Sequence, residues 1–171
     1  MASMSDKLYR PNVGIALFNA EGLVLIARRI KDDGPEVIYP GFEWQMPQGG
    51  IDANEDPRAA AARELHEETG IVSADYLAET DWLTYEFPDY AGPPHRLAHF
   101  RGQRQKWFAM RYLGDEGEID PLMPRNGQEP EFDAWRWERL ETLPALVVPF
   151  KRAVYEQIAG HFSAFAVAAR D

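Results

Sequence analysis

The segment between Asp56 and Gly70 constrains the fold most strongly, because it carries signals for both ends of one helix. Asp56 is a typical N-cap residue, and Pro57 suits the first helical turn, where its missing N–H costs nothing. The four alanines at 59–62 are strong helix formers, and Gly70 favours the left-handed conformation that ends many helices. The sequence therefore predicts a helix between Asp56 and Gly70.

The rest of the chain alternates between strand and loop patterns. Val13, Ile15 and Leu17 precede a turn at 19–22 and a second apolar run at 23–26, which predicts a β-hairpin. Further elements are expected as strands at 43–46, 76–87, 105–113 and around Trp135 and Trp137, a tight turn at 49–50, loops at 31–41 and 114–131, and a closing amphipathic helix at 150–169. Strands interleaved with two helices favour an α/β domain that has a mixed sheet between helices.

Length and charge limit the organisation and the partners of the chain. Its 171 residues fit one domain, and we expect residues 9–169 to form it after a flexible N-terminus at 1–8. Lys and Arg number 18 against 28 Asp and Glu, so the net charge is −10. This charge argues against sequence-independent binding to duplex DNA, which requires many cations facing phosphate. A phosphorylated ligand still fits if metal ions bridge it to carboxylates.

Other aspects of composition bear on the compartment. The chain has no cysteine, which excludes disulfides and thiol catalysis and fits a reducing compartment. No apolar run approaches the roughly 18 residues of a membrane span, so we expect no membrane partner. The first seven residues lack an apolar signal core, and we expect a cytoplasmic location. Met1 and Met4 both suit a native start, so the origin of Met1 to Ser3 stays open.

Three glutamates, Glu64, Glu67 and Glu68, fall on one side of the predicted helix and share an arc of about 100°. Like charges four residues apart repel, and the C-terminal end of a helix adds its own negative partial charge. Arg63 can offset part of this repulsion by pairing with Glu67. The acidic arc predicts a cationic partner, and a hard dication such as Mg²⁺ prefers carboxylate oxygens. An ordinary solvated acidic face is the alternative interpretation of the glutamates taken alone.

These glutamates stand inside a longer pattern with fixed spacing. Gly49 is followed after five residues by Glu55, and seven residues later by the run RELHEETGI at 63–71. The pattern resembles the Nudix box at each fixed position. The resemblance implies an α/β/α sandwich with a mixed central sheet and a loop–helix–loop catalytic motif. It also implies hydrolysis of a nucleoside diphosphate linked to another group, in which water attacks phosphorus while magnesium ions, with manganese as the alternative, neutralise the pyrophosphate.

The resemblance also implies roles for individual residues of the box. A metal site would be formed by three carboxylates and one backbone position: Glu64, Glu67, Glu68 and Gly49. Glu55 would hold Arg63, and Arg63 would orient a ligand carboxylate of the metal site. The catalytic group of the box therefore comprises Arg63, Glu64 and Glu68.

Six further blocks resemble, in the same order, the bacterial RNA pyrophosphohydrolase branch of this family, which also holds dinucleoside polyphosphate hydrolases: 9–14, 27–29, 44–50, 102–108, 130–137 and 148–152. The match implies that Glu131 is an additional metal ligand with a catalytic role. The general base stays open between Glu68 and Glu131, because a base needs reach to the attacking water.

The same match implies a set of substrate contacts: Arg10, Arg29, Val148, Phe150 and Lys151. The two arginines would hold phosphate oxygens in paired hydrogen bonds. Phe150 and Val148 would flank a base, as stacking side chains do in single-stranded recognition, and Lys151 would donate to a base carbonyl. Core packing is the alternative interpretation for the apolar pair, and solvation is the alternative for the cations.

Our leading hypothesis is a monomeric RNA 5′-pyrophosphohydrolase in mRNA decay, which converts a 5′-triphosphate RNA end to a 5′-monophosphate. An asymmetric diadenosine polyphosphate hydrolase is the alternative, because both ligands offer a polyphosphate with a nucleotide beyond it. A non-catalytic nucleotide sensor is the third interpretation, although such a module is expected to have lost carboxylates of the box. The extended loop at 31–41 leaves the base preference open, and none of the four histidines is assigned a role.

Overall fold

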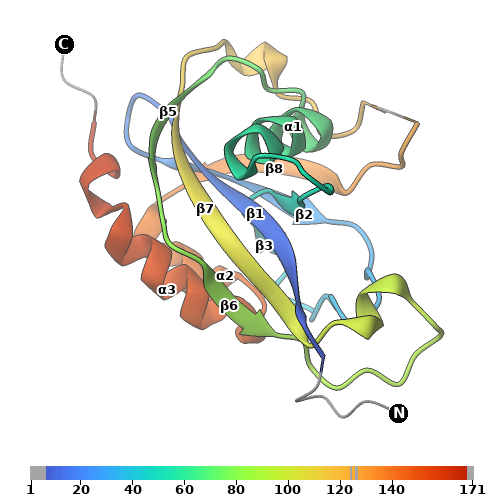
Figure 1. Cartoon of the computed structure of the whole chain (residues 1–171). Coiled ribbons are helices and arrows are strands. Elements are labelled where there is room, and N and C mark those ends of the chain that lie inside the picture. Colours follow the sequence, from blue (N-terminus) through green and yellow to red (C-terminus); the bar gives the residue numbers. More distant parts are fainter. Residues whose placement is uncertain (1–6, 124, 126, 169–171) are drawn as a thin grey trace.

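The computed structural model describes residues 7–123, 125 and 127–168. Within these ranges eight strands form one mixed sheet, and helices lie on both of its faces (Figure 1). Residues 1–6, most of the expected flexible N-terminus, lie outside the described residues, as does position 169 at the expected end of the domain. In the described part of the chain, no helix combines the length and the apolar character that crossing a membrane requires.

Strands make up most of the regular structure, and three α-helices and five short 3₁₀ turns connect them within the described residues. The strands are β1 Tyr9–Phe18, β2 Val24–Arg29, β3 Trp44–Gln45, β4 Gln48–Gly50, β5 Ala74–Glu79, β6 Leu83–Glu86, β7 Gly102–Tyr112 and β8 Phe132–Glu138. The α-helices are α1 Pro57–Thr69, α2 Leu143–Leu146 and α3 Arg152–His161. Short 3₁₀ turns are η2 Arg96–His99, η3 Glu116–Glu118, η4 Leu140–Thr142, η5 Pro149–Lys151 and η6 Ser163–Phe165.

Strand β1 lies at the centre of the sheet. It runs parallel to β7 along its whole length, from Tyr9 opposite Gly102 to Phe18 opposite Arg111. It also pairs antiparallel with β2 and β4, which confirms the predicted hairpin. Strand β2 pairs with β3 along one edge and with β8 along the opposite edge, and β7 pairs with β5 and β6 on the side away from β1. The parallel β1–β7 pair within an otherwise antiparallel sheet confirms the predicted mixed α/β architecture.

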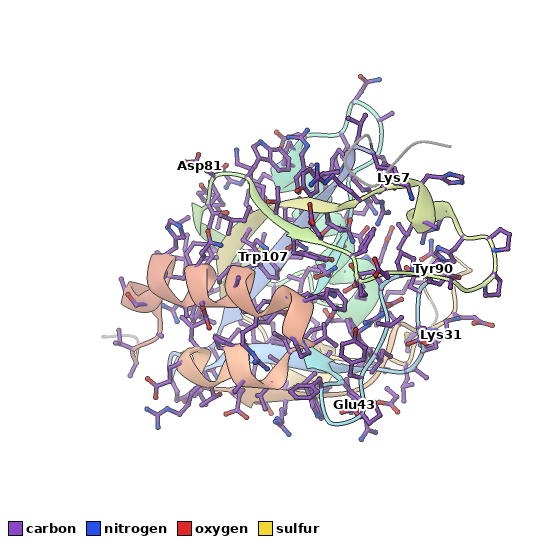
Figure 2. All side chains as sticks on the ribbon, turned by 90° about the horizontal axis from the view of Figure 1, so that it is seen from below. Lys7, Lys31, Glu43, Asp81, Tyr90 and Trp107 are labelled. Atoms are coloured by element: carbon purple, nitrogen blue, oxygen red, sulfur yellow. The ribbon has the colours of Figure 1, made fainter. Side chains whose placement is uncertain are left out.

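Alternation along β1 divides the core between the two faces of the sheet. Val13, Ile15 and Leu17 belong to the cluster under α1, together with the apolar side of that helix. Phe18 and Trp107 belong to the opposite cluster under α3. Figure 2 labels Trp107 beside the C-terminal helices. The centroid of its ring lies 5.7 Å from that of Tyr155 on α3. The sheet is therefore covered on both faces, as the expected sandwich requires.

Helix α1 begins and ends where its sequence predicts. The Asp56 side chain accepts a hydrogen bond from the Ala59 N–H at 3.1 Å, and Pro57 occupies the first turn. Gly70 adopts φ 83°, in the left-handed region, and its N–H donates to His66. Leu65 is buried against the sheet, and this leaves the glutamate side of the helix facing away from the core.

Three local predictions need correction. Gly49 and Gly50 do not form a tight turn but belong to strand β4. The expected helix at 150–169 begins as a 3₁₀ turn, and α3 ends at His161, because Phe165 turns back to meet the rings of Phe18 and Phe162. The expected strand at 76–87 is two strands, since the chain leaves β5 at Thr80, whose hydroxyl accepts from the Trp107 N–H before β6 begins.

Candidate active site

A polar pocket of about 460 Å³ lies where β1, β4 and β7 meet α1 and the loop at 31–41. Its walls are almost entirely charged or amide side chains. The carboxylates are Asp33, Glu36, Asp52, Glu64, Glu67, Glu68 and Glu131; the cations are Arg10, Arg29, Arg63 and Arg96; the amides are Asn12, Gln45, Gln48, Gln103 and Gln128; Gly49 and Gly50 complete the wall. Gly49, Arg63 and the three box glutamates therefore line one pocket, whereas Glu55 does not, and Glu131, Arg10 and Arg29 line the same pocket.

Arg63 is the centre of the ionic network on the α1 side. Its guanidinium donates to both carboxylate oxygens of Glu55 at 2.8 Å and to the Gly50 carbonyl at 2.9 Å. The Nη1 group also donates to Glu64 at 3.0 Å and to Glu67 at 3.1 Å. Hydrogen bonding to Arg63 lowers the pKa of Glu55 to about 2 and raises the pKa of Arg63. This geometry supports the predicted role of Glu55 as the residue that holds Arg63.

The carboxylates beside Arg63 carry shifted pKa values. Burial, with the nearby Glu67 charge, raises the pKa of Glu64 to about 7, although Arg63 opposes the shift. Burial also raises the pKa of Glu68 well above its usual value, with further contributions from the charges of Glu64 and Glu131. Among the described residues, Glu68 Oε2 is buried without a hydrogen-bond partner. Such carboxylates are costly to keep ionised unless a cation compensates them.

Gly49 and Gly50 leave space for side chains that approach the strand. A Cβ at Gly49 would lie 2.0 Å from the Glu64 carboxyl carbon, and a Cβ at Gly50 would lie 2.1 Å from an Arg10 guanidinium nitrogen. Neither glycine adopts a left-handed φ. These positions are glycine because of close approach, and the tight turn that the sequence suggested is not the reason.

The donor set suits a divalent cation. Glu64, Glu67, Glu68 and Glu131 bring carboxylate oxygens into one pocket, and the orphaned Glu68 oxygen offers a lone pair. Burial raises the pKa of Glu131, as it does for Glu64 and Glu68. Within the described ranges, no three His, Cys, Asp or Glu side chains already stand together as a complete ligand set. Glu64 and Glu67 are held instead by Arg63.

The Glu64 carboxyl predicts how stability depends on pH in metal-free buffer. Its proton leaves near pH 4.5 in the unfolded chain but near pH 7 in the folded one. The folded state therefore binds more protons between these values, and its free energy of unfolding is expected to fall as the pH rises from about 4.5 to 7. Urea unfolding with EDTA should show this fall in the wild type and a shallower one in Glu64→Gln. Equal slopes in both proteins would contradict the assignment.

The two predicted phosphate contacts, Arg10 and Arg29, both line the pocket but differ in their hydrogen bonding. The Arg10 guanidinium makes no hydrogen bond or ion pair with another side chain or carbonyl in the described part of the chain, and burial lowers its pKa. Arg29 is 5% exposed and donates to the Glu36 carbonyl at 2.8 Å, so it also fastens the loop at 31–41. Arg10 is therefore the cation better placed to donate to a ligand.

The predicted base contacts lie elsewhere. Val148 and Lys151 are each 1% exposed and do not line this pocket. Lys151 Nζ pairs with Glu36 at 2.6 Å and donates to Gln45 at 2.9 Å, so in this arrangement it is a core cation, and its contact with a base carbonyl stays a prediction. Phe150 is half-buried against the rings of Tyr39 and Tyr85. For Val148 the core interpretation fits, and the base-flanking role of Phe150 stays a prediction.

Sequence reasoning missed most of the amide wall and the acid of the loop, including Asn12, Gln103 and Glu36. The signal for the two amides was a polar residue at every second position next to an apolar stretch of the same strand. Arg10 and Asn12 are two positions apart on β1, and Gln103 and Gln105 continue the same alternation up to Trp107 on β7. Polar side chains in such positions need partners, and this requirement singles them out.

Comparisons with known proteins agree with this geometry. The NUDIX domain model matches residues 8–158. A protein of Afipia carboxidovorans named RNA pyrophosphohydrolase is 52% identical over 97% of this chain and 99% of its own. A protein of the same name from Rhodopseudomonas palustris strain BisB18 is 48% identical over 97% of this chain and 94% of its own.

Solved structures share the fold at low identity. A MutT protein from Methanosarcina mazei superposes with a TM-score of 0.62 at 19% identity, covering 91% of this chain and 96% of that one. The Ap4A hydrolase of C. elegans, in a binary complex, gives 0.59 at 17% identity, covering 91% and 98%. These two likenesses speak for the fold alone. Because the family model covers most of the chain and relatives at about half identity align along nearly their whole length, the chain belongs to the Nudix family.

Proposed function

We propose that the chain is a metal-dependent RNA 5′-pyrophosphohydrolase, which hydrolyses the 5′-triphosphate of an RNA and leaves a 5′-monophosphate. The observation that carries this proposal is a single pocket in which the box glutamates lie with the Arg10 guanidinium, which has no side-chain partner among the residues that the structure describes. A polyphosphate requires such a combination, because its charge must be neutralised along its length. Near-full-length relatives that carry the name RNA pyrophosphohydrolase support the same substrate.

The proposed metal site is formed by Glu64, Glu67, Glu68 and Glu131, close to the backbone of Gly49. We propose Mg²⁺ as the ion, with Mn²⁺ as the alternative, since both prefer carboxylate oxygens. When bound, the ion supplies positive charge that neutralises the pyrophosphate and polarises its phosphorus–oxygen bonds. Arg63 keeps Glu64 and Glu67 in place through its bonds to Glu55.

The protein residues complete the proposed reaction. Arg10 donates to phosphate oxygens at the mouth of the carboxylate cluster, where its guanidinium packs over Gly50. A general base takes a proton from the attacking water, and Glu68 and Glu131 are both candidates because burial raises their pKa values. An RNA end as substrate places the proposed activity in the cytoplasm, in mRNA decay, and one chain holds every residue of the proposed site, which suits a monomer.

A comparison of two substrates tests the proposal. With Mg²⁺ present, a 5′-triphosphorylated oligoribonucleotide is expected to show a kcat/KM roughly tenfold or more above that of diadenosine tetraphosphate. Chromatography of the products should yield the monophosphorylated RNA with pyrophosphate or successive phosphates. Faster turnover of the dinucleotide would instead make the chain a diadenosine polyphosphate hydrolase. Tight nucleotide binding without turnover of either substrate would indicate a sensor.

A further inference from the structure

Four amide side chains, Asn12, Gln48, Gln103 and Gln105, belong to one hydrogen-bond network at the pocket, in which Gln103 is joined to the other three through Glu36 and Tyr85. Asn12, Gln48 and Gln103 line the pocket. They come from three adjacent strands, β1, β4 and β7, and Asn12 is 1% exposed while Gln103 is 2% exposed. Gln105 Nε2 donates to Asn12 Oδ1 at 2.9 Å and to Gln48 Oε1 at 3.2 Å. An amide presents a donor at one end and an acceptor at the other, so the network has a direction that its neighbours can fix.

Trp107 fixes the direction at one end. Its indole N–H can only donate, and it donates to Gln105 Oε1 at 3.0 Å. Gln105 therefore donates its NH₂ group to Asn12, and Asn12 accepts this bond with its carbonyl oxygen. The NH₂ group of Asn12 then points away from this bond.

The buried Glu36–Lys151 pair fixes the direction at the other end. Lys151 keeps Glu36 ionised, since the pKa of Glu36 is held below its usual value by Lys151 and Arg29 in spite of burial. A carboxylate only accepts, so Gln103 must present its NH₂ group, which donates to Glu36 Oε1 at 3.2 Å. The carbonyl oxygen of Gln103 is thereby left over.

Two polar atoms therefore remain without a hydrogen-bond partner among the described residues: the donor Asn12 Nδ2 and the acceptor Gln103 Oε1. Both residues line the pocket and are more than nine-tenths buried. A buried polar atom without a partner is costly, and in a binding pocket a ligand group can satisfy it. The wall thus presents one donor and one acceptor whose identities the network determines.

We propose that Asn12 and Gln103 read the first nucleotide of the substrate, with Asn12 donating to a phosphate oxygen and Gln103 accepting from a ribose 2′-hydroxyl. The inference rests on the proposed function. Asn12 stands two residues from Arg10 on the same face of β1, so the two donors suit one anionic group. Gln103 lies opposite Arg10 in the β1–β7 register, which places its acceptor beside the phosphate-holding cation. Within an RNA chain the 2′-OH is the hydroxyl donor nearest to such a phosphate.

The test compares two oligonucleotides that carry an uncleavable 5′-triphosphate and differ only in the 2′-group of the first nucleotide. Titration calorimetry with Mg²⁺ is expected to give wild-type binding about five- to tenfold tighter for the ribose form. Gln103→Met, which removes the acceptor at similar volume, should bring this ratio close to one. Asn12→Asp keeps the acceptor for Gln105 but replaces the free donor, so it should weaken both ligands by about tenfold and preserve the ratio.

Gln157→Met is the matched control, since Gln157 is exposed on α3 and should retain the wild-type ratio. A wild-type ratio of one would overturn the inference whether or not the variants fold. A preserved ratio in folded Gln103→Met would also overturn it. If RNA is not hydrolysed but diadenosine tetraphosphate binds better than its 2′-deoxy form, the proposed function fails while the hydroxyl contact stands.

Discussion

Replacing Glu68 by Gln is expected to lower kcat on triphosphorylated RNA by at least about 100-fold. The substitution keeps the shape of the side chain but removes its charge, and with it either a metal ligand or the general base. Glu68 is the box carboxylate whose buried Oε2 has no hydrogen-bond partner among the described residues, so this oxygen keeps its lone pairs available for a metal ion or a proton.

Thermal unfolding in EDTA shows whether this loss is chemical. Burial raises the pKa of Glu68 above its value in the unfolded chain, so at neutral pH this carboxyl group lowers the free energy of unfolding. The neutral Gln removes this cost, and the Tm of the variant should equal or exceed that of the wild type. Glu156→Gln, on the exposed side of α3, is the matched control and should leave both kcat and Tm unchanged. A folded Glu68→Gln enzyme with a nearly normal kcat would contradict the assigned role.

Replacing Glu36 by Leu is expected to destabilise the protein by about 3–5 kcal/mol, a fall in Tm of roughly 10 °C. The change leaves the Lys151 ammonium, which is 1% exposed, without its partner at 2.6 Å. It also removes the acceptor that Tyr85 and Gln103 use. An unpaired buried charge is among the most destabilising features in a protein core.

A second variant separates the ion pair from the packing of the loop. Glu36→Leu combined with Lys151→Met removes both charges and should recover most of the lost stability in urea unfolding. The Lys31–Glu129 pair provides the control, because it has the same residue types at the surface, and Glu129→Leu should cost less than about 1 kcal/mol. Similar losses of unfolding free energy in Glu36→Leu and Glu129→Leu would show that burial of the ion pair does not increase its contribution to stability.

Much of the fold could be predicted from the sequence because its signals are local. Asp56, Pro57 and Gly70 act on backbone within a few residues of themselves, so the bounds of α1 followed directly. The turn at 19–22 was equally predictable, since Asn19 accepts from the N–H groups of Glu21 and Leu23. The end of α3 was not predictable, because it depends on rings brought together from β1 and the C-terminal turns.

The candidate site divides in the same way. Glu64, Glu67 and Glu68 share a face by helical period alone, and Arg63 reaches Glu67 from one turn away, so sequence determined the carboxylate cluster and its clamp. The burial of Lys151 as a paired cation depends on Glu36, which lies 115 positions earlier in the chain. No periodicity relates two such residues.

The sequence by itself therefore determined the acidic helix, the hairpin and the family, since each rests on spacing within a short stretch or on similarity along the chain. Only the tertiary structure decided that Lys151 is a core cation, that Gly50 makes room for Arg10, and that the amides Asn12 and Gln103 line the pocket. The physical reason is that burial and hydrogen-bond partners are set by strands that pair across the fold, and a side chain's chemistry depends on those partners.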